Sequence, residues 1–332
     1  MSQAAPKLQF LLDLQEQLGG SIPFERWMQE ALYHPEFGYY AAGIRGIGRR
    51  GDFTTWPVLH ESLARGIARW ALANKPSGRW HLIEIGAGTG TLAAGVLRAL
   101  GWWNRPQMHI VEVSPPLRQE QQTLLGRKTT WHPNMTEALA ACDGSALIYS
   151  NELVDAFPAR IFQNQDKVWH ELALRIENGR VEETWLAPLP DTARPDSTAF
   201  ATPWPEGQRI EVQESFATWR DDWRPAWKAG AILTIDYGDA CPALYHRRPQ
   251  GSLRAFAHHQ RLEGAAAYAG FGVRDLTVDV NFSDLIAWGG PPDAELLTLD
   301  AFLARQNRKP ASGHLDQFPE AGEAFKVLIQ SP

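Results

Sequence analysis

Short apolar runs and segments with helical spacing follow one another along much of the chain. Residues 81–84, 108–113, 145–150 and 231–238 are apolar runs of the kind that forms buried parallel strands. Segments with apolar residues at helical spacing lie between several of these runs. This alternation predicts an α/β fold with a parallel sheet, and such sheets bind ligands at the carboxyl ends of their strands.

Further elements are predicted on either side of these strands. Helices are expected at about 7–20, 21–33, 59–73 and from about Gln208 to Trp227, and residues 283–322 are predicted to be helices with polar loops. Alternating runs flank Asn178-Gly179, which is a strong β-hairpin signal. Residues 325–329 are expected to form a last strand. A glycine-rich segment between residues 43 and 51 is interpreted as a lid loop, with a plain surface loop as the alternative.

The stretch HLIEIGAGTG, residues 81–90, is the candidate cofactor site. Its three glycines form a turn in which backbone comes close to a ligand, and the helix that follows offers free N–H groups and positive potential. A dinucleotide fingerprint would need a glycine where this chain has Thr91. The acid-x-G-x-G-x-G spacing that starts at Glu84 is instead that of class I methyltransferases, which bind S-adenosylmethionine.

A second acid strengthens this interpretation. Glu112 lies in the next apolar run, 26 residues after Gly86. An acid at the end of the second strand of such a unit accepts hydrogen bonds from the ribose hydroxyls of a nucleoside. The alternative is an ordinary glycine-rich turn with a solvated glutamate.

Composition excludes several other classes of protein. The chain has 332 residues, of which 44% are hydrophobic and 21% charged, values typical of a globular protein. Its net charge of −6 argues against a protein that binds duplex nucleic acid. Without a spanning apolar run, a signal-peptide pattern or a transit-peptide pattern, we expect a cytoplasmic protein with no membrane span.

The sequence gives no metal-ligand spacing. Cys142 and Cys241 lie far apart, which predicts neither a disulfide framework nor a metal site, and both are interpreted as thiols in a reducing compartment. The pair His258-His259 has no third ligand at a suitable distance along the chain. We therefore expect no metal.

Motifs along nearly the whole chain occur in the order of one known family. They are MQEALYHP (28–35), FGYY (37–40), GDF (51–53), EIGAGTGTL (84–92), VEVSP (111–115) with LR (117–118), NELVDAFP (151–158), WHE (169–171), IDYG (235–238), GSLR (251–254) with His259, DLT (275–277) and FKVL (325–328). Together they resemble the MidA-type methyltransferases, which are related to a mitochondrial complex I assembly factor that is a protein arginine methyltransferase.

The resemblance implies a class I methyltransferase (Rossmann-like) sheet with an N-terminal helical cap, a β-hairpin insertion and a C-terminal helical insertion. We expect the cap and lid loop at 1–75, the cofactor domain at 76–282 and 323–332 with the hairpin at about 160–205, and the helical insertion at 283–322. The implied cofactor is S-adenosyl-L-methionine. Its expected contacts are Gly51, Asp52, Phe53, Glu84, Gly86, Gly88, Gly90, Leu92, Glu112, Val113, Met135 and Asn151.

The family activity implies methyl transfer to an arginine of a protein substrate, with a respiratory-complex subunit as the candidate partner. A guanidinium must be held by carboxylates, and Glu152 and Asp155 are the expected catalytic pair. Alternatively, Asp155 caps the following turn and Glu152 closes the cofactor pocket. The acceptor cleft is predicted to contain Tyr39, Tyr40, Trp56, Asp236 and His259, each of which also has a purely structural interpretation.

Three positions depart from the family pattern and leave other functions open. Thr55-Trp56-Pro57-Val58 replaces T-S-P-E, Asp279 stands where the family has histidine, and Thr298-Leu299 replaces T-Q. These departures favour, as alternatives, a cofactor-binding but catalytically silent assembly or scaffold protein, or a methyltransferase acting on a small molecule. The sequence leaves the oligomeric state open.

Overall fold

The computed structural model describes residues 4–43, 57–257, 260–262, 264–289, 294–306 and 324–332. The chain forms two compact units, each built from three separate segments. Unit 1 comprises Met1–Arg45, Asp155–Ala217 and Ala240–Asp284, and unit 2 comprises Gly46–Val154, Thr218–Asp239 and Leu285–Pro332. Among the described residues, no helix is both long and apolar enough to cross a bilayer.

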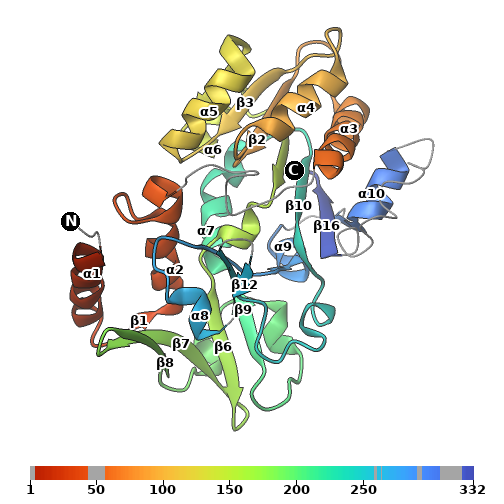
Figure 1. The fold of residues 1–332 in the computed structure, drawn as a ribbon. Coiled ribbons are helices and arrows are strands. Elements are labelled where there is room, and N and C mark those ends of the chain that lie inside the picture. The colour runs from red at the N-terminus through yellow and green to blue at the C-terminus, as the bar shows by residue number, and fades with distance from the viewer. Residues whose placement is uncertain (1–3, 44–56, 258–259, 263, 290–293, 307–323) are drawn as a thin grey trace. The chain divides into compact units, whose positions relative to one another are not determined.

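Unit 2 contains the predicted parallel sheet, with strand order β15-β16-β10-β5-β2-β3-β4 (Figure 1). Strands β10, β5, β2, β3 and β4 run parallel, whereas β16 is antiparallel to both β10 and β15. The strand bounds are β2 (His81–Ile85), β3 (Gln107–Val111), β4 (Thr129–His132), β5 (Leu147–Asn151), β10 (Ile232–Asp239), β15 (Glu295–Thr298) and β16 (Phe325–Gln330). The predicted α/β fold is confirmed.

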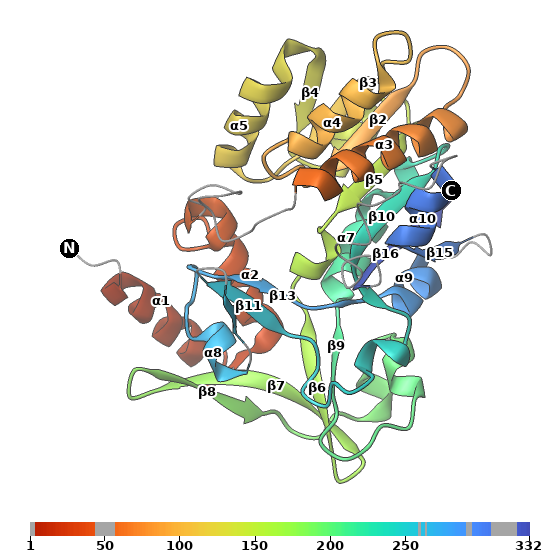
Figure 2. The ribbon, with the colours of Figure 1, turned by 45° about the vertical axis from the view of Figure 1, so that its right-hand side comes forward.

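Helices cover both faces of this sheet. They are α3 (Pro57–Asn74), α4 (Thr91–Leu100), α5 (Pro115–Leu125), α6 (Met135–Ala140) and α10 (Leu299–Gln306), with short η2 (Gly126–Lys128) and η6 (Arg224–Ala226). One apolar core lies between the sheet and α3, α4 and α10 (Figure 2). A second core on the other face combines Ile83, Ile85 and Val111 with buried residues of α6. Alternate residues of β2, β3 and β5 therefore contribute to opposite cores.

Unit 1 is built around a curved antiparallel sheet of order β1-β7-β6-β9, with β8 paired to β7, and a small sheet of order β12-β11-β13. Its strands are β1 (Ile22–Pro23), β6 (Arg160–Gln165), β7 (Val168–Glu177), β8 (Arg180–Trp185), β9 (Arg209–Val212), β11 (Arg254–Ala257), β12 (Gln260–Leu262), β13 (Asp275–Thr277) and β14 (Val280–Asn281). Its helices are α1 (Ala4–Gln17), α2 (Phe24–Tyr33) and α8 (Ala265–Tyr268), with short η1 (Tyr39–Gly43), η4 (Asp191–Ala193), η5 (Thr198–Ala201) and η7 (Ala243–Tyr245). Three elements cross the unit boundary: η3 (Val154–Ala156), α7 (Glu214–Trp223) and α9 (Phe282–Gly289).

The apolar core of unit 1 joins segments that are far apart in the sequence. Phe24, Trp27 and Met28 of α2 are fully buried and belong to the same core as Tyr268. The hairpin turn at Asn178-Gly179 is confirmed. Both residues have positive φ, as the two central residues of a type I′ turn require.

Three expectations about elements and boundaries differ from the structure. The helix expected from Gln208 begins only at Glu214, because residues 209–212 form β9 and pair with β6. The insertion expected to be helical contains β15, which extends the edge of the main sheet. Helix α3, assigned to the cap, instead packs against α4 in unit 2, and the rest of the described cap joins the hairpin and residues 240–284 in unit 1.

Candidate cofactor and active site

The glycine turn between β2 and α4 has the backbone that its sequence predicts. Gly86, Gly88 and Gly90 have φ values of 66°, 54° and 80°, which residues other than glycine rarely adopt. A Cβ on Gly86 would lie 2.9 Å from Cδ1 of Leu153, so a side chain here would also require the Leu153 side chain to shift. Helix α4 begins at Thr91 and directs its first N–H groups to the carboxyl ends of the strands.

Glu112, directly after β3, is held in place by its neighbours. Its Oε1 accepts a hydrogen bond from the Ser114 N–H at 2.9 Å, and its Oε2 accepts one from Gln121 Nε2 at 2.9 Å. The same Nε2 donates to the Gly88 carbonyl at 2.8 Å, while Trp131 Nε1 donates to Gln121 Oε1 at 2.9 Å. Gln121 thus connects the second acid directly to the glycine turn, a role that the sequence did not reveal.

These residues fit a nucleoside cofactor. Each carboxylate oxygen accepts more than one hydrogen bond, so Glu112 can also accept from a ribose diol. Its neighbour Val113 is 67% exposed, which leaves the chain beside the acid open to a ligand. Burial raises the pKa of Glu112, although the Ser114 and Gln121 hydrogen bonds oppose this shift by favouring the charged carboxylate.

Glu84 is the more deeply buried of the two acids. Glu84 is 2% exposed, and its Oε2 accepts a hydrogen bond from the Tyr149 hydroxyl at 2.7 Å. Burial raises the pKa of Glu84 to about 8, and the Tyr149 hydrogen bond lowers it only in part. No cation among the described residues offsets that burial. A positively charged ligand group nearby would therefore favour the ionised carboxylate.

The other expected cofactor contacts lie in unit 2, but they differ in accessibility. Leu92 on α4 and Met135 at the start of α6 are 6% and 1% exposed and belong to opposite cores of the sheet. Asn151 is half-buried at the end of β5. Their contacts with the cofactor stay predictions. Gly51, Asp52 and Phe53 lie outside the residues that the structure describes.

Glu152 follows β5 in a strained conformation. Its φ is 51°, its N–H donates to the Ile235 carbonyl at 3.0 Å, and its Oε1 accepts from Asn151 Nδ2 at 3.0 Å. The next two N–H groups, of Leu153 and Val154, donate to Oδ2 of Asp236 at 3.1 and 2.8 Å. The backbone around the proposed catalytic acid is therefore fixed from strand β10.

Asp236 was expected in the acceptor cleft, yet it is fully buried, with an exposed fraction of 0%. Its Oδ1 accepts from the Tyr237 N–H at 2.9 Å, so both of its oxygens hold backbone groups. Burial raises the pKa of Asp236 to about 7, with a further contribution from the negative charge of Glu152. These contacts give Asp236 a positioning role, and direct contact with an acceptor stays a prediction.

The remaining expected residues lie in unit 1 or outside the described ranges. Asp155 is buried, and its carbonyl accepts a hydrogen bond from the Val278 N–H at 3.1 Å. The hydroxyl of Tyr40 donates to both oxygens of Asp275 at 2.9 and 3.0 Å, and Tyr39 packs edge-on against Tyr40. Trp56 and His259 lie outside the described residues. The catalytic role of Asp155 and the substrate contacts of all four aromatic residues stay predictions.

The departure at Asp279 has a structural explanation. Its buried carboxylate forms ion pairs with Arg254 and Arg248. Burial favours the neutral acid, but the two guanidinium groups outweigh it and hold the pKa of Asp279 below its usual value. The Asp279 N–H also donates to Ser252 Oγ at 2.9 Å, so the GSLR motif and the substituted acid form one cluster.

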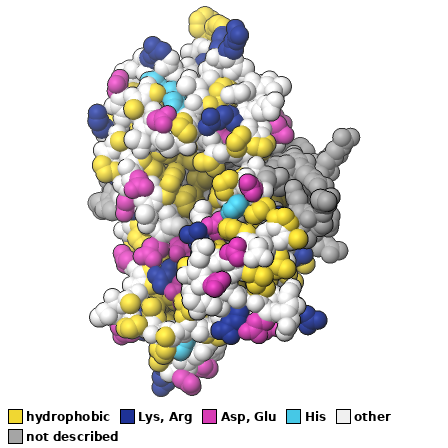
Figure 3. Space-filling view, turned by 90° about the vertical axis from the view of Figure 1, so that its left-hand side faces the viewer, with side chains coloured by type: hydrophobic (Ala, Val, Ile, Leu, Met, Phe, Trp, Pro, Cys, Tyr) yellow, Lys and Arg dark blue, Asp and Glu magenta, His cyan; other side chains and the backbone are white. Residues whose placement is uncertain are grey.

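Figure 3 shows how charged side chains of the described residues are distributed on one face of the molecule. On the face drawn in Figure 3, basic and acidic side chains of the described residues are interspersed, and they form no continuous basic band. Protein surfaces that bind duplex nucleic acid normally present such a band.

The parallel sheet, the glycine turn and the two strand-end acids define a class of α/β enzymes that use a nucleoside cofactor. A family model described as "Putative S-adenosyl-L-methionine-dependent methyltransferase" matches residues 62–295. The chain belongs to this family, and the expectation of a methyltransferase that uses S-adenosyl-L-methionine is thereby confirmed.

Individual relatives support the MidA-type assignment. The chain is 28% identical over 300 residues to a protein of Drosophila melanogaster named "Protein arginine methyltransferase NDUFAF7 homolog, mitochondrial", with 79% of this chain and 65% of the relative covered. It is 28% identical over 305 residues to "Protein arginine methyltransferase NDUFAF7, mitochondrial" of Danio rerio, with 82% and 69% covered. The chain thus spans about two thirds of the length of these curated relatives.

A solved structure matches almost the whole chain. It is a "likely methyl transferase" from Burkholderia thailandensis bound to S-adenosyl-homocysteine, with a TM-score of 0.76, 27% identity and coverage of 99% of this chain and 93% of the other. The expected fold class is confirmed. The expected cytoplasmic location is contradicted, because the curated relatives are named as mitochondrial proteins.

Proposed function

We propose that this enzyme transfers a methyl group from S-adenosyl-L-methionine to the guanidinium group of an arginine in a protein. The relatives named protein arginine methyltransferases support this choice of acceptor. The observation that carries the proposal is Glu152, a carboxylate at the carboxyl end of a parallel strand, in a left-handed backbone conformation.

Such a conformation is unfavourable for a glutamate. A non-glycine residue with positive φ costs about 1–2 kcal/mol and persists where the surrounding structure fixes it. Here the hydrogen bond to Ile235 and the two bonds from the following N–H groups to Asp236 fix it. A Cβ built on Gly86 would lie 2.9 Å from Cδ1 of Leu153, so the turn that contains Glu152 and Leu153 lies beside the glycine turn. A strained acid at this point favours a role in the reaction.

The chemistry requires a carboxylate near the acceptor. The cofactor supplies an electrophilic methyl group on a sulfonium, and in-line transfer depends mainly on alignment. A guanidinium has a pKa above about 12, so it arrives protonated and must lose a proton as the methyl group is transferred. We assign Glu152 to hold and orient the guanidinium and to take up this proton, while S-adenosyl-homocysteine departs as the leaving group. Asp155 is proposed to support it, with the alternative that Asp155 only organises the turn.

The acceptor protein is proposed to be a subunit of a respiratory complex, on the basis of the family resemblance. The test incubates the purified chain with methyl-labelled S-adenosyl-L-methionine and an extract rich in such subunits, followed by acid hydrolysis and amino-acid analysis. The proposal predicts label in methylarginine, and mass spectrometry of the labelled proteins identifies the acceptor.

Other outcomes of this experiment would overturn the proposal. Label confined to small molecules would indicate a small-molecule methyltransferase. Normal cofactor binding without transfer to any acceptor would indicate a catalytically silent scaffold.

A further inference from the structure

Three histidines lie in a row across adjacent parallel strands of unit 2. His81 begins β2, His109 lies on β3 in register with Ile83, and His132 ends β4 in register with Val111. His81 Nδ1 is 3.0 Å from His109 Nε2, and His109 Nδ1 is 2.9 Å from His132 Nε2. The three side chains share the face of the sheet that α6 covers.

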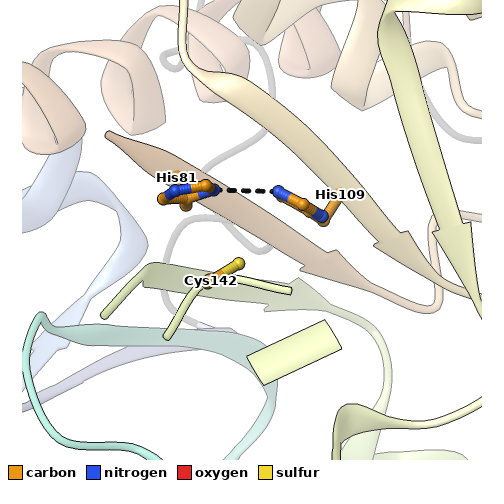
Figure 4. A group of neighbouring side chains, drawn as sticks. All are labelled: His81, His109 and Cys142. Atoms are coloured by element: carbon orange, nitrogen blue, oxygen red, sulfur yellow. Dashed lines mark hydrogen bonds between the residues drawn. The ribbon is translucent and has the colours of Figure 1, made fainter. Parts of the chain in front are cut away.

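A cysteine completes the group. Cys142, just after α6, is 3% exposed, and its sulfur points toward the two rings of His81 and His109 (Figure 4). One ligand atom from each of these three residues lies within 4.8 Å of the other two. His109 is 5% exposed, whereas His81 is half-buried and gives the group access to solvent.

The arrangement has the chemistry of a transition-metal site. Imidazole nitrogen and thiolate sulfur are the ligands that Zn²⁺ prefers, and three protein ligands leave one coordination position open. Nitrogens of His81 and His109 face each other at close range, where both can contact one ion. The other nitrogen of His109 faces His132, as expected when an outer partner fixes the tautomer of a ligating histidine.

We propose that His81, His109 and Cys142 bind one divalent transition-metal ion, best matched by Zn²⁺, with water in the fourth position and His132 as the outer partner of His109. Sequence spacing did not reveal the site, because its ligands come from three separate segments.

This site is separate from the cofactor turn. His81 is the first residue of β2, and the glycine turn follows Ile85 at its other end, roughly 13 Å away at 3.3 Å per residue. The ion would tie the start of β2, β3 and the segment after α6 together. Its loss is therefore expected to affect stability more than cofactor binding.

The test uses the full chain without an affinity tag, after treatment with a chelator. Calorimetric titration with Zn²⁺ is expected to show one ion per chain. Co²⁺, used as a spectroscopic probe, is expected to produce the near-ultraviolet charge-transfer absorption of a cobalt–thiolate bond. Cys142→Ser should abolish this absorption, whereas Cys241→Ser, which changes the other thiol, should retain it.

Histidine variants test the remaining ligands. His81→Gln replaces a half-buried proposed ligand. It should lower the affinity for Zn²⁺ by a larger factor than His132→Asn does. The outer partner is expected to account for about 10- to 100-fold in affinity. His246→Gln, at an exposed position in unit 1, is the matched control and should bind as the unchanged chain does. Binding of S-adenosyl-homocysteine confirms that each variant is folded.

Two results would overturn the proposal. The first is the absence of stoichiometric binding, which would leave a hydrogen-bonded row of histidines that packs without metal. The second is equal Zn²⁺ affinity in the unchanged chain, Cys142→Ser and His81→Gln, which would show an adventitious surface ion. Neither result bears on methyl transfer, so this proposal and the proposed function fail independently.

Discussion

The Asp236 carboxylate accepts a hydrogen bond of 2.8 Å from the backbone N–H of Val154, which ties strand β10 to the turn after β5. The same oxygen accepts from Leu153, and the other oxygen accepts from Tyr237. A buried acid thus determines the path of the chain on which the proposed catalytic Glu152 lies.

Asp236→Asn should therefore destabilise unit 2. An amide nitrogen cannot accept a hydrogen bond, so at least one buried backbone donor loses its partner, at a cost of about 1–3 kcal/mol. Urea unfolding measures this change. Asp239→Asn is the control, because Asp239 has a 39% exposed side chain and lies 3.2 Å from Lys326, and a pair of this kind contributes less than about 1 kcal/mol. An equal decrease in the free energy of unfolding of the two variants would contradict the role of Asp236 in holding the backbone of the turn.

Gly86→Ala tests the close approach at the glycine turn. Both Gly86 and Gly101 have left-handed backbones, with φ values of 66° and 69°, but only at Gly86 would a Cβ meet another residue. Each alanine should cost about 1–2 kcal/mol in backbone strain. Gly86→Ala should in addition weaken binding of S-adenosyl-homocysteine, measured by calorimetry, whereas Gly101→Ala should not. Unchanged binding by both variants would remove Gly86 from the cofactor site.

Glu84 should make stability depend on pH. Its folded pKa of about 8 lies above the ordinary value of 4.5, so between these values the unfolded chain has lost a proton that the folded chain retains. The free energy of unfolding therefore falls as pH rises through this window. Glu84→Gln removes that dependence while its amide oxygen can still accept from Tyr149.

The measurement is urea unfolding of the ligand-free chain at about pH 5 and about pH 8. The free energy of unfolding of Glu84→Gln, taken relative to that of the unchanged chain, should be more than about 1.4 kcal/mol higher at the higher pH than at the lower one. This difference is equivalent to one pKa unit. Glu120→Gln, at an exposed position on α5, should gain nothing. The same stability difference at both pH values would show that Glu84 is ionised in the fold.

Glu152→Ala should separate catalysis from cofactor binding. If Glu152 holds the acceptor, the variant should lose at least about 100-fold in the rate of methyl transfer, within the range for a positioned acid–base group. Its affinity for S-adenosyl-homocysteine should stay within about twofold of the unchanged value, since Glu112 and the glycine turn are intact. Glu137→Ala, at an exposed position on α6, is a control for both measurements. Full activity in Glu152→Ala would show that this carboxylate is not catalytic.

The sequence predicted the features that depend on local pattern. Apolar runs predicted β2, β3, β5, β10 and β16, and the spacing of the glycines after Glu84 predicted the turn between β2 and α4, because these features depend on residues close together in the sequence. Residues 209–212 were assigned to a helix. Pairing with β6 decides their conformation, and a local pattern does not show that pairing.

Side-chain roles that depend on packing were not predictable in the same way. Sequence patterns led to no functional prediction for Gln121, yet its side chain joins Glu112 to Gly88. Asp236 looked like a strand-end acid facing a ligand, yet its strand directs it to backbone donors. Strand register, rather than spacing along the chain, brings such groups together.

The most direct test of the cofactor assignment is calorimetric titration with S-adenosyl-L-methionine and, separately, with NAD. We expect micromolar binding of S-adenosyl-L-methionine, equivalent to about −8 kcal/mol, and no binding of NAD. Glu112→Ala should weaken binding by about 1.5–3 kcal/mol, the worth of a hydrogen bond to a charged group, while Glu120→Ala on α5 should bind normally. NAD binding, or full affinity for S-adenosyl-L-methionine in Glu112→Ala, would contradict the assignment of the glycine turn and Glu112 as the cofactor site.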